Sequence, residues 1–227
     1  MAACTDTLNP IMDRTALTVL DLGLIEFHAA HILQERLVAG IASGHEPETL
    51  LLLHHPPVYT TGAGGNPANL LDPAVPLVRT NRGGDVTFHG PGQLIGYPLL
   101  RLTRFGCDLH SYLRFLEEVL IETVALFGVA AGRIDHRTGV WTNRGKLASI
   151  GIGVRHLVSM HGFALNCGDD LDGFAVINPC GITGCPMTSL HQETGFAVDL
   201  VSLKVALATT IDELLPGIPG SHMNVIS

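Results

Sequence analysis

Predicted β-strands follow one another through the middle of the chain, and this run is what most constrains the fold. Between residues 129 and 166 the sequence reads as short strands, VAAGRID, GVWTN and GKLASIGIGVRHLVSMHGFALNC, the last of which predicts a long hairpin. Clustered strands pair with their neighbours in an antiparallel way, whereas strict strand-helix alternation would predict a parallel sheet. We therefore expect an α+β fold built on a mixed, mostly antiparallel sheet.

Three amphipathic helices are expected to flank this sheet. Apolar residues recur at helical spacing in LIEFHAAHILQERLVAGIASG, which ends on Gly44, in DLHSYLRFLEEVLIETVALFG and in VDLVSLKVALATTIDELLP. Further strands are expected in LTVLDLG, in TLLLLHHPPVYTTG as one buried strand ending in a turn, and near residues 77–81, 85–88 and 93–99.

Composition indicates one folded unit in a reducing compartment. The chain has 227 residues, 46% hydrophobic and 15% charged, so we expect one domain over residues 1–227 with loosely ordered ends at 1–14 and 216–227. Its five cysteines are odd in number and irregularly spaced, which is typical of free thiols. Neither a targeting peptide nor an apolar run of about 18 residues is found, so we expect a cytoplasmic protein with no membrane partner.

The net charge of -8 argues against nucleic-acid binding, but the charge is unevenly distributed. Residues 79–155 contain ten Lys or Arg against six Asp or Glu, and the rest of the chain contains three against fifteen. The basic middle region would attract an acidic protein partner, although scattered surface arginines explain the same count.

One stretch, RGGDVTFHGPGQLIGYP at residues 82–98, places five glycines and two prolines inside two expected strands. Glycine has no side chain, so it lets a backbone segment or a ligand approach closely. We interpret the stretch as the wall of a binding site.

Lys146 and a cysteine of the INPCGITGCPMTSL loop are the candidate catalytic residues. Lys146 lies beside an almost wholly apolar strand, where burial would favour the neutral amine and make it a base. The alternative is that it points into water from the start of the strand. Cys180 and Cys185 share the loop, and either thiolate would be an accessible nucleophile. A metal or redox role for this pair is a less favoured alternative. Cys107 and Cys167 are expected to fill core space.

Twelve histidines raise the question of a metal site. The closest sets, at residues 28 and 31 and at residues 54 and 55, lack the spacing and carboxylates of a metal motif, so we interpret them as surface or capping residues and expect no metal. His89 and His161 each precede a glycine at an expected strand end. Both are candidates for lining one cavity, with turn capping as the alternative.

Glycine-rich loops raise the question of nucleotide binding. GAGGN at 62–66 and RGGD at 82–85 fit neither GxGxxG nor GxxxxGK[ST] spacing. ATP-dependent chemistry is therefore disfavoured, and no cofactor is expected.

Four segments together resemble the lipoyl(octanoyl) transferases, the octanoyl-[acyl-carrier-protein]:protein N-octanoyltransferases. They are RGGDVTFHGPGQLIGYP, GKLASIG, HGFALN and NPCGITGCPMTSL, in this order, and the resemblance covers about residues 15–212. It implies the fold of biotin and lipoate protein ligases. It also implies an acyltransferase of protein lipoylation that moves an octanoyl or lipoyl group through a cysteine acyl-enzyme.

The resemblance also implies roles for individual residues. The family's nucleophilic cysteine falls on Cys180 and its lysine on Lys146, which leaves Cys185 as a bystander. Trp141 departs from the smaller residue expected at its position, and His161 is a candidate auxiliary residue. The implied substrate contacts are Arg82, Gly83, Gly84, Asp85, Val86, Thr87, Phe88, His89, Ser149, Ile150, Gly151, Gly162, Phe163 and Ala164.

The implied donor is octanoyl-acyl carrier protein, and the implied acceptors are the lipoyl domains of 2-oxoacid dehydrogenases and the glycine cleavage H protein. Glycines 83, 84, 90 and 92 are then expected to line a narrow tunnel for the acyl chain. Lys146 would lower the pKa of Cys180 or take its proton, and Lys146 or His89 would assist the acceptor amine. N–H groups near Gly181 or in the SIG segment would bind the oxyanion. The alternatives are an ATP-dependent lipoate or biotin ligase and a non-catalytic module that binds lipoyl domains or acyl chains.

Overall fold

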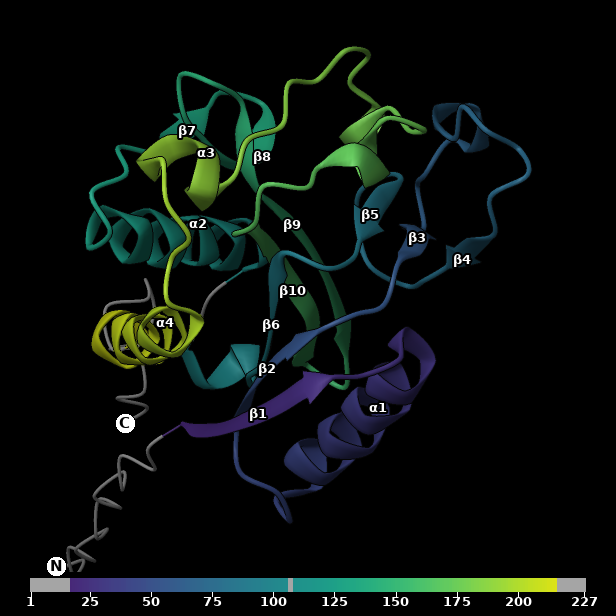
Figure 1. Cartoon of the computed structure of the whole chain (residues 1–227). Helices are drawn as coiled ribbons and strands as arrows, with labels where there is room; N and C mark the ends of the chain where they lie inside the picture. Colours follow the sequence, from purple (N-terminus) through teal and green to yellow (C-terminus); the bar gives the residue numbers. More distant parts are fainter. Residues whose placement is uncertain (1–16, 106–107, 216–227) are drawn as a thin grey trace, which may run out of the picture.

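A seven-stranded sheet forms the centre of the computed structural model, which describes residues 17–105 and 108–215 (Figure 1). Cys107 and the ends expected to be loosely ordered, 1–14 and 216–227, lie outside the described residues. The strand order is β1-β2-β6-β10-β9-β8-β7. The strands are β1 Thr18–Leu24, β2 Thr49–His54, β6 Gln93–Leu99, β7 Gly132–Ile134, β8 Arg137–Trp141, β9 Lys146–Arg155 and β10 Val158–Asn166.

Strand pairing in this sheet is mixed and mostly antiparallel, as the sequence predicts. Only β1 and β2 run parallel, and every other neighbouring pair of the sheet is antiparallel. β9 and β10 form the predicted hairpin, paired from Val158↔Arg155 to Leu165↔Ala148. The α+β fold class is therefore confirmed.

Helices cover both faces of the large sheet (Figure 1). α1 Phe27–Ser43 packs on one face, and α2 Leu109–Ala125 and α4 Leu200–Leu214 pack on the other. α1 ends at Gly44, whose left-handed φ of 82° lets its N–H bond to the last turn. α3 Leu190–Thr194 is short and was not predicted. In the described residues, no helix is long and apolar enough to cross a bilayer.

A second sheet of three strands, order β4-β3-β5, lies beside the large one. The strands are β3 Val58–Thr61, β4 Leu77–Arg79 and β5 Thr87–His89. The segment TLLLLHHPPVYTTG, predicted as one strand, therefore contributes β2 to one sheet and β3 to the other. Pro56 and Pro57 lie at the break, because proline lacks the N–H that a strand ladder needs.

Four 3₁₀ turns complete the fold: η1 Pro67–Asn69, η2 Leu102–Phe105, η3 Asp172–Phe174 and η4 Pro179–Gly181. A small apolar cluster, Val86, Phe88, Phe174 and Ile177, packs η3 and the segment before η4 against β5. The small sheet thereby carries the η4 turn to the edge of the large sheet. This arrangement positions the candidate site.

Candidate active site

The side chains of Lys146 and Cys180 meet, although 34 residues separate them in the sequence. Lys146 Nζ lies 2.8 Å from Cys180 Sγ, and Lys146 is fully buried. A buried amine needs a polar partner, because desolvation without one is costly, and the sulfur is that partner. The alternative in which Lys146 points into water is therefore wrong.

The chain just beyond Cys180 fixes the backbone of Lys146. The Lys146 N–H donates to the Pro186 carbonyl at 2.8 Å, and the Thr188 N–H donates to the Lys146 carbonyl at 3.1 Å. One continuous segment thus carries the cysteine and pairs with the strand that carries the lysine. The distance between the two side chains is therefore set by backbone hydrogen bonds.

Gly139 and Trp141 of β8 enclose the lysine side chain. A Cβ on Gly139 would lie 2.6 Å from Lys146 Cε, and the φ of 126° at Gly139 also favours glycine. The Trp141 ring centroid lies 5.3 Å from Lys146 Nζ, within the range of a cation–π contact when the amine is protonated. Trp141, which departs from the family expectation, therefore has a structural place beside the lysine.

Glu117 of α2 holds Gly139 in place, and no motif in the sequence marks it. Its carboxylate is 1% exposed, and Oε1 accepts the Gly139 N–H at 3.0 Å. Oε2 accepts from Arg114 Nη1 at 2.6 Å and from Arg133 Nε at 3.0 Å. The one sequence signal is its position three and four residues from apolar residues of the helix stripe, which puts a carboxylate at the edge of the buried face.

Cys180 occupies a strained position in the η4 turn. Its φ of 56° and ψ of 27° are left-handed values that are costly for residues other than glycine. The Cys180 N–H donates to the Val86 carbonyl at 3.1 Å, and the Gly181 N–H donates to the Asn178 carbonyl at 3.0 Å. The turn holds the sulfur toward Lys146, and neither of these two N–H groups is free to bind an oxyanion.

The Asp85 carboxylate ties the glycine-rich segment to the η1 turn, which lies beside the cysteine turn. It accepts from Asn69 Nδ2 at 2.6 Å, from the Asn66 N–H at 3.0 Å and from the Val86 N–H at 2.7 Å. A Cβ on Gly181 would approach Asp85 Oδ2 to 3.0 Å, so glycine leaves room for this carboxylate. We interpret Asp85 as an anchor of the site.

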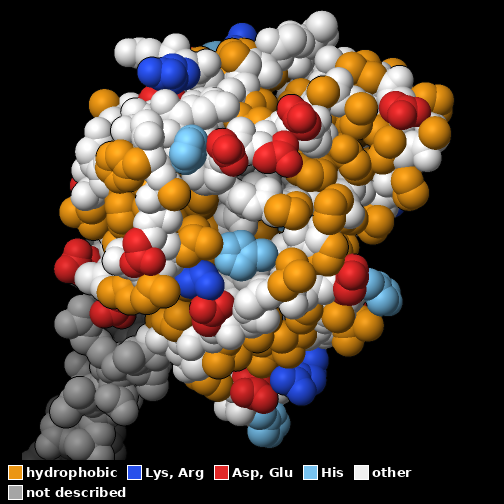
Figure 2. All heavy atoms as spheres, in the orientation of Figure 1, with side chains coloured by type: hydrophobic (Ala, Val, Ile, Leu, Met, Phe, Trp, Pro, Cys, Tyr) orange, Lys and Arg blue, Asp and Glu red, His pale blue; other side chains and the backbone are white. Residues whose placement is uncertain are grey.

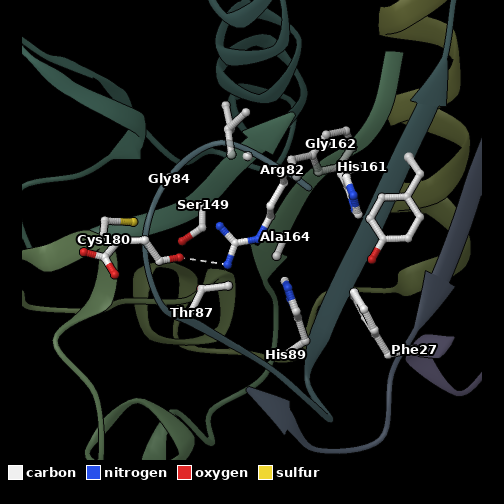
Figure 3. A pocket seen from close by; sticks show the side chains of 15 residues that line it. Phe27, Arg82, Gly84, Thr87, His89, Ser149, His161, Gly162, Ala164 and Cys180 are labelled. Carbon is white, nitrogen blue, oxygen red and sulfur yellow. Dashed lines mark hydrogen bonds between the residues drawn. The ribbon is translucent and has the colours of Figure 1, made fainter. Parts of the chain in front are cut away.

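A narrow cavity, called the closed cavity below, runs from Cys180 toward α1. Figure 3 shows the Arg82 guanidinium between Cys180 on one side and the rings of His89 and His161 on the other. The residues that line it are Phe27, Arg82, Gly84, Asp85, Thr87, His89, Tyr97, Ser149, Ile150, Gly151, His161, Gly162, Phe163, Ala164 and Cys180. His89 and His161 share one cavity, as predicted, but His161 lies inside β10 and does not end a strand.

Three of the expected substrate contacts do not line the closed cavity. Val86 and Phe88 point into the small apolar cluster, although the Val86 carbonyl holds Cys180. Gly83 lines a second cavity. The structure brings the other expected contacts, together with Cys180, to a single cavity.

The expectation that Gly90 and Gly92 line the tunnel is wrong. A Cβ on Gly90 would lie 2.3 Å from the Phe88 ring, and Gly92 has a left-handed φ of 83° and lies against Gly168. These two glycines therefore allow close packing within the protein. Sequence alone does not separate a glycine that admits a ligand from one that admits a neighbouring chain segment.

Burial governs the charges in the closed cavity. Desolvation lowers the pKa of Arg82, and the nearby Cys180 opposes that shift. Desolvation also lowers the pKa of His89 well below its ordinary value and the pKa of His161 to about 3. The histidine rings are therefore neutral at pH 7, and the Arg82 guanidinium is the cation among them.

Several buried polar atoms of the closed cavity have no hydrogen-bond partner within the described part of the chain. They are Arg82 Nε, Thr87 Oγ1, His89 Nδ1 and Ser149 Oγ. Most buried polar groups in proteins are paired, so unpaired donors that line a cavity are available to a bound molecule. Ser149 and Thr87 lie between Cys180 and Arg82 in Figure 3.

Aromatic residues that the sequence did not mark close the far end of this cavity. His55 is fully buried, its Nδ1 lies 2.7 Å from the Ile25 carbonyl, and its Nε2 lies 2.9 Å from Tyr97 Oη. The interpretation of His55 as a surface or capping residue is therefore wrong. Phe27 and Tyr97 line the cavity beside it. Within the described ranges, no group of three or more potential metal ligands is found.

Comparison with solved structures shows which fold surrounds this site. Lipoate-protein ligase A bound with ATP matches with a TM-score of 0.61 and 17% identity over 88% of this chain and 84% of that chain. The biotin protein ligase from Aquifex aeolicus in complex with biotin and ATP matches with a TM-score of 0.56 and 15% identity over 90% of this chain and 73% of that chain. The chain therefore has the fold of lipoate and biotin protein ligases, as the resemblance implied.

Sequence comparison then gives the family. A model described as the lipoyl protein ligase A/B catalytic domain matches residues 27–212. The octanoyltransferase of Geotalea uraniireducens is 56% identical over 204 residues, covering 88% of this chain and 95% of the relative. That of Geobacter metallireducens is 58% identical over 202 residues, covering 87% and 95%. The chain belongs to the lipoyl protein ligase A/B catalytic domain family.

Proposed function

We propose that the protein transfers an octanoyl or lipoyl group from an acyl carrier protein thioester to the lysine amine of a lipoyl domain, through a thioester on Cys180. The contact between Lys146 Nζ and Cys180 Sγ at the mouth of the closed cavity is the observation that carries this proposal. The names of the relatives support the acyl group. Lipoyl domains of 2-oxoacid dehydrogenases and the glycine cleavage H protein are the proposed acceptors, and a single domain carries both half-reactions.

The first half-reaction acylates the enzyme. The Lys146 amine takes the thiol proton of Cys180, and the thiolate attacks the carbonyl carbon of the donor thioester. The bond between that carbon and the carrier sulfur breaks, and the Lys146 ammonium returns its proton to the leaving thiolate. The products are octanoyl-Cys180 and the free thiol of the carrier.

The second half-reaction forms the amide. The neutral amine of the acceptor lysine attacks the octanoyl-Cys180 carbonyl, and the bond to the Cys180 sulfur breaks. The amine proton passes to Lys146 and from there to the Cys180 thiolate, which restores the starting enzyme. The reaction uses the thioester already present in the donor, so the proposal includes no ATP and no metal.

The closed cavity is the proposed site of the acyl chain. Each methylene that leaves water contributes about 0.8 kcal/mol to binding. The unpaired hydroxyls of Ser149 and Thr87 are the proposed donors to the carbonyl oxygen, in place of the N–H near Gly181, which is already bonded to Asn178. A hydrogen-bond donor placed at a developing oxyanion typically lowers the activation free energy by about 3 kcal/mol.

A transfer assay with matched cysteine variants tests the function. Labelled octanoyl-carrier protein and a lipoyl domain are incubated with wild type, Cys180→Ser or Cys185→Ser, and label on the lipoyl domain is measured. We expect transfer with wild type and Cys185→Ser and none with Cys180→Ser. Transfer only from free octanoate plus ATP would indicate a ligase instead. Binding of the lipoyl domain without transfer by wild type would indicate a non-catalytic module.

A further inference from the structure

Cys185 is a second thiol in the segment that carries Cys180, and the proposed mechanism gives it no role. It follows Cys180 by five positions in the sequence. In the described part of the chain the cysteines are free thiols: Cys180 and Cys185 are both half-buried, and Cys167 is buried. A thiol close to a reactive cysteine gives the pair a chemistry that neither has alone, which is the formation of a disulfide.

The backbone between the two cysteines is tightly folded. The Ile182 N–H donates to the Pro179 carbonyl at 3.1 Å, and the Cys185 N–H donates to the Ile182 carbonyl at 3.3 Å, so one turn follows another. Gly181 and Gly184 have left-handed φ values of 72° and 63°. A Cβ on Gly184 would have no neighbour within 4 Å, so the backbone there borders open space. These two glycines give the segment the backbone freedom to bring one sulfur to the other.

Both sulfur atoms lie near Lys146. Cys180 Sγ accepts from Lys146 Nζ at 2.8 Å. Cys185 Sγ lies 3.8 Å from the Pro186 carbonyl oxygen, and the same oxygen accepts the Lys146 N–H at 2.8 Å. The charges of Lys146 and Cys180 both act on the Cys185 thiol. The fold therefore holds one sulfur at the tip of the lysine side chain and the other close to the lysine backbone.

The two thiols differ in reactivity. The Lys146 amine stabilises a thiolate on Cys180, and the thiolate is the form that attacks an oxidant. Burial raises the pKa of Cys185, so its thiol keeps the proton at pH 7. Burial also raises the pKa of Cys167, to about 12, which makes that thiol unreactive. An oxidant therefore meets a reactive sulfur at Cys180, with a neutral thiol close behind it in the chain.

A small, uncharged oxidant suits the approach to this sulfur. Cys180 lines the closed cavity and also the second cavity, the one that Gly83 lines. The chain has a net charge of -8, and on the face shown in Figure 2 the Lys and Arg side chains are few and lie apart. An anionic peptide disulfide therefore finds no continuous basic surface on that face. A hydroperoxide is small and carries no charge, so neither restriction applies to it.

We propose that Cys180 and Cys185 form a reversible redox pair, which a hydroperoxide oxidises to a disulfide and thereby switches the enzyme off. The site of oxidation is independent of the proposed function, whereas the loss of octanoyl transfer rests on it. A Cys180 sulfur that is bonded to another sulfur cannot accept an acyl group. The disulfide closes a short loop in an accessible segment, and such bonds are readily reduced, so a dithiol restores the enzyme.

The oxidation proceeds in two steps. In the first, the Cys180 thiolate attacks one peroxide oxygen: an S–O bond forms, the O–O bond breaks, and the departing hydroxide takes up a proton, which balances the proton that the thiol has lost. In the second, the Cys185 sulfur attacks the sulfur of the sulfenic acid. The S–S bond forms, the S–O bond breaks, and the hydroxyl group leaves as water with the Cys185 proton. Together, two thiols are oxidised to one disulfide, and hydrogen peroxide is reduced to two water molecules.

Thiol mapping tests the pair itself. Reduced protein, with no acyl donor present, is exposed to hydrogen peroxide, denatured and labelled with iodoacetamide, and the labelled cysteines are located by mass spectrometry. We expect Cys180 and Cys185 to lose the label together in a monomer that is lighter by two hydrogen atoms, and Cys167 to keep it. Dithiothreitol should restore both labels. A labelled Cys185 beside an oxidised Cys180, or a disulfide between two chains, would contradict the inference.

Matched variants test the effect on transfer. Wild type, Cys185→Ser and Cys167→Ala, which should start with equal rates, are treated with hydrogen peroxide and then with dithiothreitol, and octanoyl transfer to a lipoyl domain is measured after each step. Dithiothreitol should raise the rate of oxidised wild type and oxidised Cys167→Ala at least about tenfold, because a disulfide is reducible. Cys185→Ser should recover by less than about twofold, because a sulfenic acid without a resolving thiol is oxidised further to an irreversible sulfinic acid. Equal recovery in wild type and Cys185→Ser would overturn the inference.

The two experiments separate failure of the inference from failure of the proposed function. Thiol mapping uses no substrate, so it reports on the redox pair even if wild type transfers no octanoyl group, in which case the proposed function fails. If wild type transfers the group and hydrogen peroxide leaves Cys185 as a free thiol, only the redox pair fails.

Discussion

The two cavities that meet at Cys180 differ in how their polar groups are held. In the closed cavity, Arg82 is buried and its guanidinium donates to carbonyl oxygens of Thr60, Gly83 and Asp85. A second, wider cavity of about 610 Å³, called the open cavity, also reaches Cys180, and its basic residues His136 and Arg137 are exposed at the turn between β7 and β8 and at the start of β8. The difference shows a fixed, buried set of polar groups on one side of the sulfur and an exposed set on the other, and we propose the buried side as the site of the acyl chain.

Replacement of Lys146 should have the largest effect, because the proposed mechanism uses its amine for proton transfer in both half-reactions. Lys146→Met keeps the length and apolar stem of the side chain and removes the amine. We expect octanoyl transfer to fall about 10²- to 10⁴-fold, the usual contribution of a positioned acid–base group. Rates of transfer, together with circular dichroism to confirm the fold, check this. A loss below threefold would remove Lys146 from the mechanism.

Acid should destabilise the protein through His161, which lines the closed cavity. The pKa of His161 in the folded protein is about 3, below its ordinary value of 6.5, so the unfolded chain binds the proton more readily. The contribution of His161 to the free energy of unfolding is therefore fully present above about pH 6.5. It is lost as the pH falls from there toward 3, by up to about 1.4 kcal/mol per pH unit.

His161→Gln removes this titration. Urea unfolding at pH 7 and pH 5 should show that the variant loses about 2 kcal/mol less stability between the two values than wild type does. Equal pH dependence in wild type and His161→Gln would show that this ring is not held neutral by burial.

Glu117 should act on the lysine through Gly139. Glu117→Met removes the acceptor of the Gly139 N–H, and we expect kcat to fall about tenfold with little change in KM, because a displaced lysine misplaces the proton transfer. Glu117→Gln keeps an acceptor oxygen and should restore most of the rate. Glu118→Gln is the matched control, since Glu118 pairs with Arg133 at the surface. A purely structural role would lower the unfolding temperature of Glu117→Met and leave kcat of the folded enzyme unchanged.

The smallest expected effect is on chain length. Ala164 lines the closed cavity and not the open one, so Ala164→Val should narrow the space for the acyl chain. Each methylene displaced costs about 0.8 kcal/mol, or about fourfold in the kcat/KM ratio of octanoyl to hexanoyl thioesters. Thr138→Val, which changes only the open cavity, should leave that ratio unaltered. A fall in the ratio with Thr138→Val would place the acyl chain in the open cavity and contradict the assignment.

Local patterns in the sequence predict the parts of this molecule that depend on local structure. The hairpin at residues 146–166 and the helix ending at Gly44 follow from strand and helix periodicity. Most residues of the closed cavity were implied by the resemblance of four motifs to the octanoyltransferases, and periodicity alone does not identify them. Burial of Lys146 depends on Gly139 and on the cysteine segment, which meet it only in the folded chain.

Features that arise from long-range packing are not visible in the sequence. His55 looks like a polar residue between a strand and a Pro-Pro turn, yet the fold brings the Ile25 carbonyl and Tyr97 to its two ring nitrogens. The open cavity is assembled from six separated segments, and no motif connects the β7–β8 turn with the glycine-rich loop. Glu117 is likewise identified only by its contact with Gly139.

The central claim is that the sulfur of Cys180 carries the acyl group on its way from the carrier protein to the lipoyl domain. Mass spectrometry of the intact protein after brief incubation with octanoyl-carrier protein alone, followed by peptide mapping, tests it most directly. The account predicts one added octanoyl group, found on Cys180, which disappears when a lipoyl domain is supplied. An octanoyl group on Cys185, or rapid transfer to the lipoyl domain by protein that never becomes acylated, would contradict it.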